Sequence, residues 1–196
     1  MEEPQFINPH FNASQVPSSK PSGKSVLLLV LKFALLYSIT AALYDWVVFQ
    51  FLQGPVDPKS GLPVGAGFFV KIILLFVSIT LCIKEYRDTY LQGRISLGKA
   101  VYMALLVGVL GGALFGIYGV IKLQYWVQID YDAIFEFFKE TTDGMVEEER
   151  EFEFYEMARS TIYYMYHPVT VYISSFLFGV IWSLLLGLIS GLMLKK

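Results

Sequence analysis

One apolar stretch, Ala100–Trp126, limits the fold more than any other part of the sequence. It is longer than the roughly 20 apolar residues that a helix needs to cross the hydrocarbon core of a bilayer. Small residues recur in it at every fourth position, namely Ala104, Gly108, Gly112 and Gly116. These positions share one helix face, and a face without large side chains lets another helix approach closely. The stretch therefore predicts a membrane helix against which other helices pack.

Three further apolar blocks have the length of membrane spans. The chain is 55% hydrophobic and 16% charged, whereas soluble domains carry roughly 25% charged residues. Because the apolar excess comes in long blocks, it favours membrane spans over a large soluble core. The predicted spans are residues 26–51, 66–83, 100–123 and 169–194. We therefore expect an all-α, polytopic integral membrane protein with one four-helix membrane domain over residues 25–194.

The segments between these spans are polar. Residues 1–24 are rich in Pro, Ser and Asn, which is typical of a flexible tail. The apolar run behind this tail is too long for a secretory signal, so we expect the first span to be retained. The turn-rich linker 52–65 predicts that the first two spans are antiparallel neighbours. In the connection 84–99, we expect a break at Gly93 and a helix N-cap at Ser96.

The segment 124–167 lies between the third and fourth spans and holds 11 of the 17 acidic residues. Residues 129–138 read as a short amphipathic helix, and Asp143-Gly144 as a turn. From 147 to 166, apolar residues recur at helical spacing, namely Phe152, Tyr155, Ala158, Ile162 and Met165. Pro168 suits the first turn of the helix that follows. We therefore expect an amphipathic helical segment here, outside the membrane.

Basic residues gather on one side of the predicted spans. They are Lys20, Lys24, Lys84, Arg87, Arg94, Lys99, Lys195 and Lys196. The short loop on the opposite side contains Lys59 alone. The positive-inside rule then places both termini and the 84–99 connection in the cytoplasm, and 124–167 outside it.

The fourth span has its own stripe of small residues. Its members are Ser175, Gly179, Ser183, Gly187 and Gly191. Two such stripes indicate that the third and fourth spans meet closely, either directly or across a dimer interface.

Three charges fall at similar depth near the outer ends of the spans: Asp45, Lys71 and Lys122. A charge in a membrane segment costs roughly 2.5–3.5 kcal/mol at the centre and is usually paired or functional. One hypothesis is an ion pair between Asp45 and Lys71, or Lys122, that lines a polar pocket under the acidic segment. The alternative is that all three side chains simply reach the headgroups, as we expect of Lys32.

Candidate catalytic, cofactor-binding and metal-ligating residues are absent from the sequence. It contains two histidines, no HExxH, no G-x-S-x-G and no Gly-rich phosphate loop. The acidic run Glu147–Glu153 lacks EF-hand spacing and reads either as a solvated helix face or as a binder of cations or a basic partner. The net charge of −2 does not suggest nucleic acid, and the single cysteine, Cys82, cannot form an internal disulfide.

Two short stretches carry a resemblance. Ile83–Asp88 (IKEYRD) and Gly93–Ala100 (GRISLGKA) resemble the signature of a bacterial, Bacteroidetes-type membrane-protein family, domain of unknown function 4199. The order of spans and the acidic segment are also similar, so the resemblance covers residues 25–194. It implies a small four-span protein of the bacterial inner membrane and brings no activity, cofactor or catalytic residue. Members are sometimes encoded near polyprenyl-phosphate glycosyltransferases, which implies such an enzyme as a partner.

These features favour a non-enzymatic role. The leading hypothesis is a structural or accessory subunit that binds other membrane proteins, or a second copy of itself, through its small-residue helix faces. The alternative is a carrier or channel for a small solute or a lipid-linked sugar, with the three membrane charges along its path. In both cases the lipid bilayer is the surrounding partner.

Overall fold

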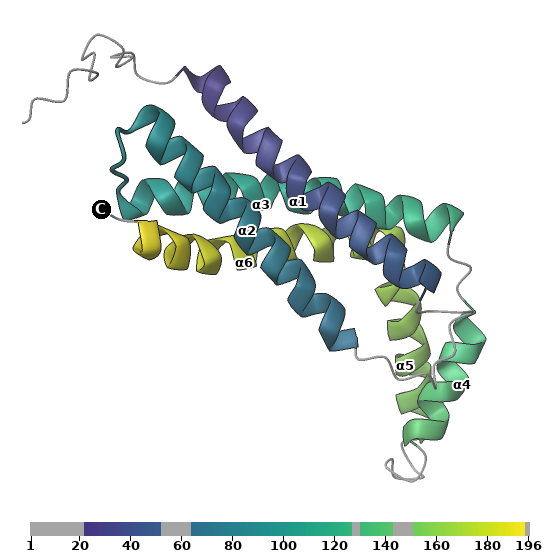
Figure 1. The fold of residues 1–196 in the computed structure, drawn as a ribbon. Helices are drawn as coiled ribbons and strands as arrows, with labels where there is room; N and C mark the ends of the chain where they lie inside the picture. Colours follow the sequence, from purple (N-terminus) through teal and green to yellow (C-terminus); the bar gives the residue numbers. More distant parts are fainter. Residues whose placement is uncertain (1–21, 52–63, 127–129, 143–150, 195–196) are drawn as a thin grey trace, which may run out of the picture.

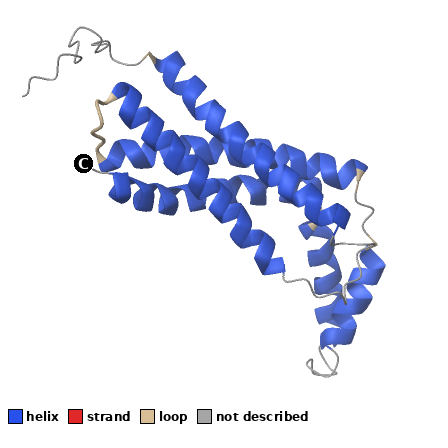
Figure 2. Ribbon diagram, in the orientation of Figure 1, coloured by secondary structure: helices blue, strands red, loops and turns tan. Residues whose placement is uncertain are grey.

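The computed structural model describes residues 22–51, 64–126, 130–142 and 151–194, and within them every regular element is a helix (Figure 2). This confirms the all-α prediction. Most of the tail and of the 52–65 linker, the Asp143-Gly144 turn, the start of the acidic run and the two C-terminal lysines lie outside the described residues.

Six helices follow one another along the described chain. Their bounds are α1 Gly23–Phe51, α2 Val64–Tyr90, α3 Leu97–Tyr125, α4 Tyr131–Thr142, α5 Glu151–Met165 and α6 Pro168–Leu194. Four of them, α1, α2, α3 and α6, are long and apolar enough to cross a membrane. The chain is therefore a multi-pass membrane protein, as predicted.

Helix α2 ends later than the sequence suggested. The polar residues 84–90, which we expected in a connection, continue the helix to Tyr90. Gln92 then adopts a left-handed conformation (φ 52°), and the Gly93 N–H donates to the Arg87 carbonyl at 3.1 Å. This pattern closes the helix because it satisfies one of the carbonyls left free in its last turn. Ser96 is the N-cap residue of the next helix, as predicted, but its side chain makes no capping hydrogen bond.

The four long helices form a bundle in which α3 and α6 make the closest pair, with α1 and α2 packed against it (Figure 1). The buried core is apolar and includes Val30, Phe33, Leu75, Ile79, Met103 and Val107. Large apolar side chains also cover the outward faces, for example Leu28, Ile73 and Ile181. In a bilayer these outward faces contact lipid, because no water is present there to penalise their exposure.

The two ends of the bundle differ. At one end α1 and α3 finish and α2 and α6 begin, and α4 and α5 lie there side by side (Figure 1). We call α4 and α5 the cap, this end the cap end, and the opposite end the basic end, because Lys24, Lys84, Arg94 and Lys99 lie there.

The apolar face of α5 differs from the prediction. Phe152 is 78% exposed and Met165 is also exposed, whereas Phe154 turns toward α4 and stacks on Phe138 with ring centroids 5.9 Å apart. Tyr155 is buried and meets Phe135 edge to face at 6.2 Å. The cap is therefore held together by aromatic contacts between its two helices.

Candidate functional site

Asp45 of α1 lies between two lysines at the cap end. Its Oδ1 is 3.2 Å from Lys71 Nζ of α2, and its Oδ2 accepts a 2.7 Å hydrogen bond from Lys122 Nζ of α3. The three side chains are 21%, 25% and 20% exposed, in that order. One carboxylate therefore joins three membrane helices, and the structure brings together all three charges that the sequence singled out.

The placement of these charges follows from the helix order. Asp45 and Lys122 come shortly before the ends of α1 and α3, and Lys71 comes shortly after the start of α2. Because α2 runs antiparallel to the other two, all three side chains reach the same depth at the cap end. Pairing lowers the cost of holding charges at the edge of the hydrocarbon region.

Aromatic side chains lie next to this charge cluster. Lys71 Nζ is 5.0 Å from the centroid of the Phe115 ring, a distance at which a cation is attracted to the ring face. The rings of Tyr37 and Tyr118 lie 6.2 and 5.7 Å from the same phenyl ring. Both tyrosine hydroxyls are buried and have no hydrogen-bond partner among the residues that the structure describes. The interior beside the cluster is therefore lined by aromatic rings, and two of them carry hydroxyls that form no hydrogen bond with the described residues.

The small residues of α3 and α6 face each other. A β-carbon built on Gly187 would lie 2.5 Å from Ala104 Cβ, and one built on Gly112 would lie 3.0 Å from the Ser175 carbonyl oxygen. One built on Gly108 would collide with Ser183 and with the Gly179 carbonyl. The remaining stripe members follow the same pattern, Gly116 against Tyr172 and Gly191 against Leu97 and Ala100. The structure thus joins the two stripes directly, within one chain.

Contacts at the other end of α2 were not foreseen from the sequence. Lys32 Nζ lies 2.7 Å from a Glu85 carboxylate oxygen, joining α1 to α2. The Arg87 guanidinium donates to the Leu194 carbonyl at 3.3 Å, at the end of α6. Both were missed because residues 84–90 were read as a loop. Glu85 and Arg87 directly follow the apolar run of α2, and this continuity could have been used to predict a longer helix.

A hydrogen bond of 2.8 Å joins the hydroxyls of Thr80 on α2 and Ser190 on α6. On α1, Ser38 donates to the Gly111 carbonyl of α3 at 3.0 Å. Hydroxyl contacts of this kind hold helices together where water is absent.

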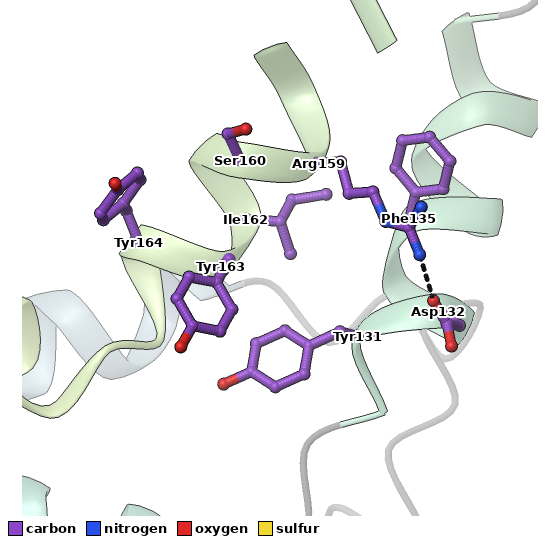
Figure 3. Close-up of a pocket in the computed structure, with 8 residues that line it drawn as sticks. All are labelled: Tyr131, Asp132, Phe135, Arg159, Ser160, Ile162, Tyr163 and Tyr164. Atoms are coloured by element: carbon purple, nitrogen blue, oxygen red, sulfur yellow. Dashed lines mark hydrogen bonds and ion pairs between the residues drawn. The ribbon is translucent and has the colours of Figure 1, made fainter. Parts of the chain in front are cut away.

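The cap contains a pocket of about 410 Å³ (Figure 3). Tyr131 of α4 and Tyr163 of α5 point toward each other across it, with ring centroids 5.6 Å apart. On its other side Arg159 pairs with Asp132 at 3.1 Å and lies over the Phe135 ring. The pocket thus offers aromatic faces beside an exposed ion pair, which together suit an amphipathic group or a partner side chain.

The comparisons with known proteins give a family and nothing closer. No curated protein and no solved structure matches this chain. A family model described as "Protein of unknown function (DUF4199)" matches residues 26–196, which include the four membrane helices, the charge cluster and the cap. The resemblance noted at residues 83–100 is therefore confirmed, and the chain belongs to the DUF4199 family.

Proposed function

We propose that this protein is a non-enzymatic accessory subunit of the bacterial inner membrane that binds another membrane protein through its cap. The proposal departs in one respect from the sequence-based hypothesis, which assigned partner binding to the small-residue faces. Those faces are occupied by each other within the chain, so a partner needs a different surface.

The observation that carries the proposal is where the cap is attached. Its two helices are inserted between α3 and α6, the closest pair in the bundle. Small residues along that pair let the two backbones approach closely. Helices α4 and α5 contact each other, and α5 also contacts α6. The cap therefore lies beside this closely packed pair, and a surface that is already ordered binds a partner at a lower entropic cost.

The cap also exposes large apolar side chains to its surroundings. Phe152, Met157 and Tyr164 of α5 are each more than three-fifths exposed, although the cap carries many acidic residues. Aromatic residues and methionine are enriched at protein–protein interfaces. An exposed apolar surface rimmed by charges is typical of an interaction site.

The orientation in the proposal follows the positive-inside rule. Lys24, Lys84, Arg94 and Lys99 lie at the basic end, which supports a cytoplasmic basic end and a cap outside the cytoplasm. The partner surface would then face the extracytoplasmic space. A polyprenyl-phosphate glycosyltransferase is the partner class that the family resemblance suggests.

Purification of the full chain from native membranes in mild detergent tests the proposal. We expect a stoichiometric membrane-protein partner, whose yield falls at least tenfold in the double variant Met157→Ser/Tyr164→Ser. The matched control is Leu192→Ala, which removes a side chain of similar exposure from the lipid-facing side of α6 and should leave the yield unchanged. A strictly monomeric protein without a stoichiometric partner would contradict the proposal.

A second candidate is a carrier for a small solute or a lipid-linked sugar. The observation that favours it is the charge cluster of Asp45, Lys71 and Lys122 beside the buried hydroxyls of Tyr37 and Tyr118. Polar groups inside a membrane bundle often mark a transport path. Flux through proteoliposomes that is abolished by Asp45→Asn or Lys71→Met would support this candidate, and equal flux in wild type and variants would contradict it.

A further inference from the structure

A groove of about 480 Å³ opens at the basic end, away from the charge cluster and the cap. Its walls come from the beginnings of α1 and α3, and Tyr86 of α2 also lines it. On α1 it is lined by Val26 and Leu27, and on α3 by Lys99, Tyr102, Met103 and Leu106.

The polarity of this groove changes with depth. On α3 the lining residues follow one another at helical spacing, from Lys99 near the helix start to Leu106, about 10 Å further along the axis. On α1, Val26 and Leu27 likewise lie about one turn further into the helix than its first residue, Gly23. The groove is therefore cationic at the helix ends and apolar toward the membrane interior. An amphiphile with an anionic head and a hydrocarbon tail would match it, with the head at the helix ends and the tail toward the membrane interior.

The charge at the helix ends favours an anion. Lys24 and Lys99 are exposed there, and no ion pair joins either of them to a carboxylate in the described part of the chain. The nearby carboxylates are already engaged, Glu85 with Lys32 and Asp88 with Arg87.

The backbone adds to this positive potential. Helices α1 and α3 both begin at this end, where the N-terminus of a helix carries a partial positive charge. Neither has an acidic residue in its first turn. The N-cap residue Ser96 makes no side-chain hydrogen bond to the α3 backbone, so first-turn N–H groups remain available to an acceptor.

From these observations we infer that the groove binds one anionic phospholipid, with its phosphate near Lys99 and an acyl chain against Leu27, Met103 and Leu106. Tyr102 lies between Lys99 and Leu106 along α3, and Tyr86 also lines the groove. Amphipathic rings of this kind are favoured where the hydrocarbon region meets the headgroups. Basic pockets between membrane helices are a known way to bind such headgroups. This site is independent of the partner surface proposed for the cap.

Native mass spectrometry of the full chain in detergent tests the site. The probes are phosphatidylglycerol and phosphatidylcholine with identical acyl chains, and glycerol phosphate as the headgroup without a tail. We expect one phosphatidylglycerol to be retained in preference to phosphatidylcholine, and no retention of glycerol phosphate.

Two variants make the test specific to the groove. Lys99→Gln should reduce phosphatidylglycerol retention about fivefold, because a lysine near an anionic lipid contributes about 1 kcal/mol. The matched control is Lys84→Gln, at the same end but outside the groove lining, and should leave retention unchanged. Leu27→Trp, which fills the apolar part, should reduce retention of both lipids. Equal retention of the two lipids, or equal losses in the two lysine variants, would overturn the inference.

Discussion

Gly179 of α6 packs directly on Gly112 of α3. A β-carbon built on Gly179 would lie 2.9 Å from the Gly112 Cα and 3.1 Å from its backbone nitrogen. Real β-carbons do not come this close to backbone atoms, so the two helices approach as closely as their backbones allow. The rest of the bundle is assembled on this pair.

Gly179→Ala should therefore destabilise the protein. The added methyl group meets backbone atoms, which cannot rotate away, so α3 and α6 must separate. Overpacking of this kind costs about 1–3 kcal/mol. Thermal unfolding in detergent would measure the loss. The matched control is Gly98→Ala in α3, where a β-carbon meets nothing within 4 Å, and it should be neutral or slightly stabilising.

Asp45→Asn should also lower stability. The change leaves Lys71 and Lys122 close together without the carboxylate that lies between them. Removing one partner of a fully buried ion pair destabilises a protein by about 3–5 kcal/mol. We expect a smaller loss of about 1–3 kcal/mol here, because these three side chains are about one-fifth exposed. The measurement is again thermal unfolding in detergent.

The comparison for Asp45 is Asp132→Asn in the cap. Its pair with Arg159 is exposed, and exposed pairs contribute at most about 1 kcal/mol. If Asp45→Asn and Lys71→Met both unfold like the wild type, the cluster does not stabilise the bundle.

The membrane helices could be predicted from the sequence because a run of about 20 apolar residues is typical of a transmembrane helix and rare elsewhere. It predicted less well where helices end. Hydropathy reports contact with lipid, whereas a helix can continue into water, as α2 does to Tyr90. For that reason Glu85 and Arg87 were assigned to a loop, and their contacts with Lys32 and Leu194 were missed.

The candidate site shows the same difference. The shared depth of Asp45, Lys71 and Lys122 could be predicted from their distance to the span ends. Which lysine contacts Asp45 depends on how each helix is rotated about its axis, and in the structure both do. In the cap, helical spacing placed Phe152 on the apolar face, although Phe152 and Phe154 both alternate with glutamates and either could pack. The contact of Phe154 with Phe138 on α4 decides it, and that contact depends on tertiary structure.

The hydroxyl pair Thr80–Ser190 should couple α2 to α6. We expect Thr80→Val and Ser190→Ala each to cost about 0.6 kcal/mol, which is typical of hydrogen bonds between membrane helices. The double variant should cost less than the sum of the two, because both changes remove the same bond. A double-mutant cycle measures this coupling, and strictly additive losses would show that the two hydroxyls do not interact.

The proposed orientation predicts a labelling pattern. Cys82 is the single cysteine in the sequence, so in a Cys82→Ser background an introduced reporter cysteine is the only thiol. Ser160→Cys in α5 should react with a membrane-impermeant maleimide on intact spheroplasts, and Ser96→Cys before α3 should react only after lysis. The reverse pattern would place the cap in the cytoplasm and contradict the orientation.

The packing of α3 on α6 within one chain can be tested by a single cross-link. A β-carbon built on Gly119 lies 3.0 Å from Val171 Cγ1. That separation is close to the ~3 Å between a sulfur and the far β-carbon in a disulfide with a 2.05 Å S–S bond. In the Cys82→Ser background, oxidation of Gly119→Cys/Val171→Cys should give a cross-linked monomer on a non-reducing gel. Gly119→Cys/Val169→Cys, with the second cysteine at an exposed position of α6, should not cross-link. A disulfide-linked dimer, or no cross-link in the first pair, would contradict the account.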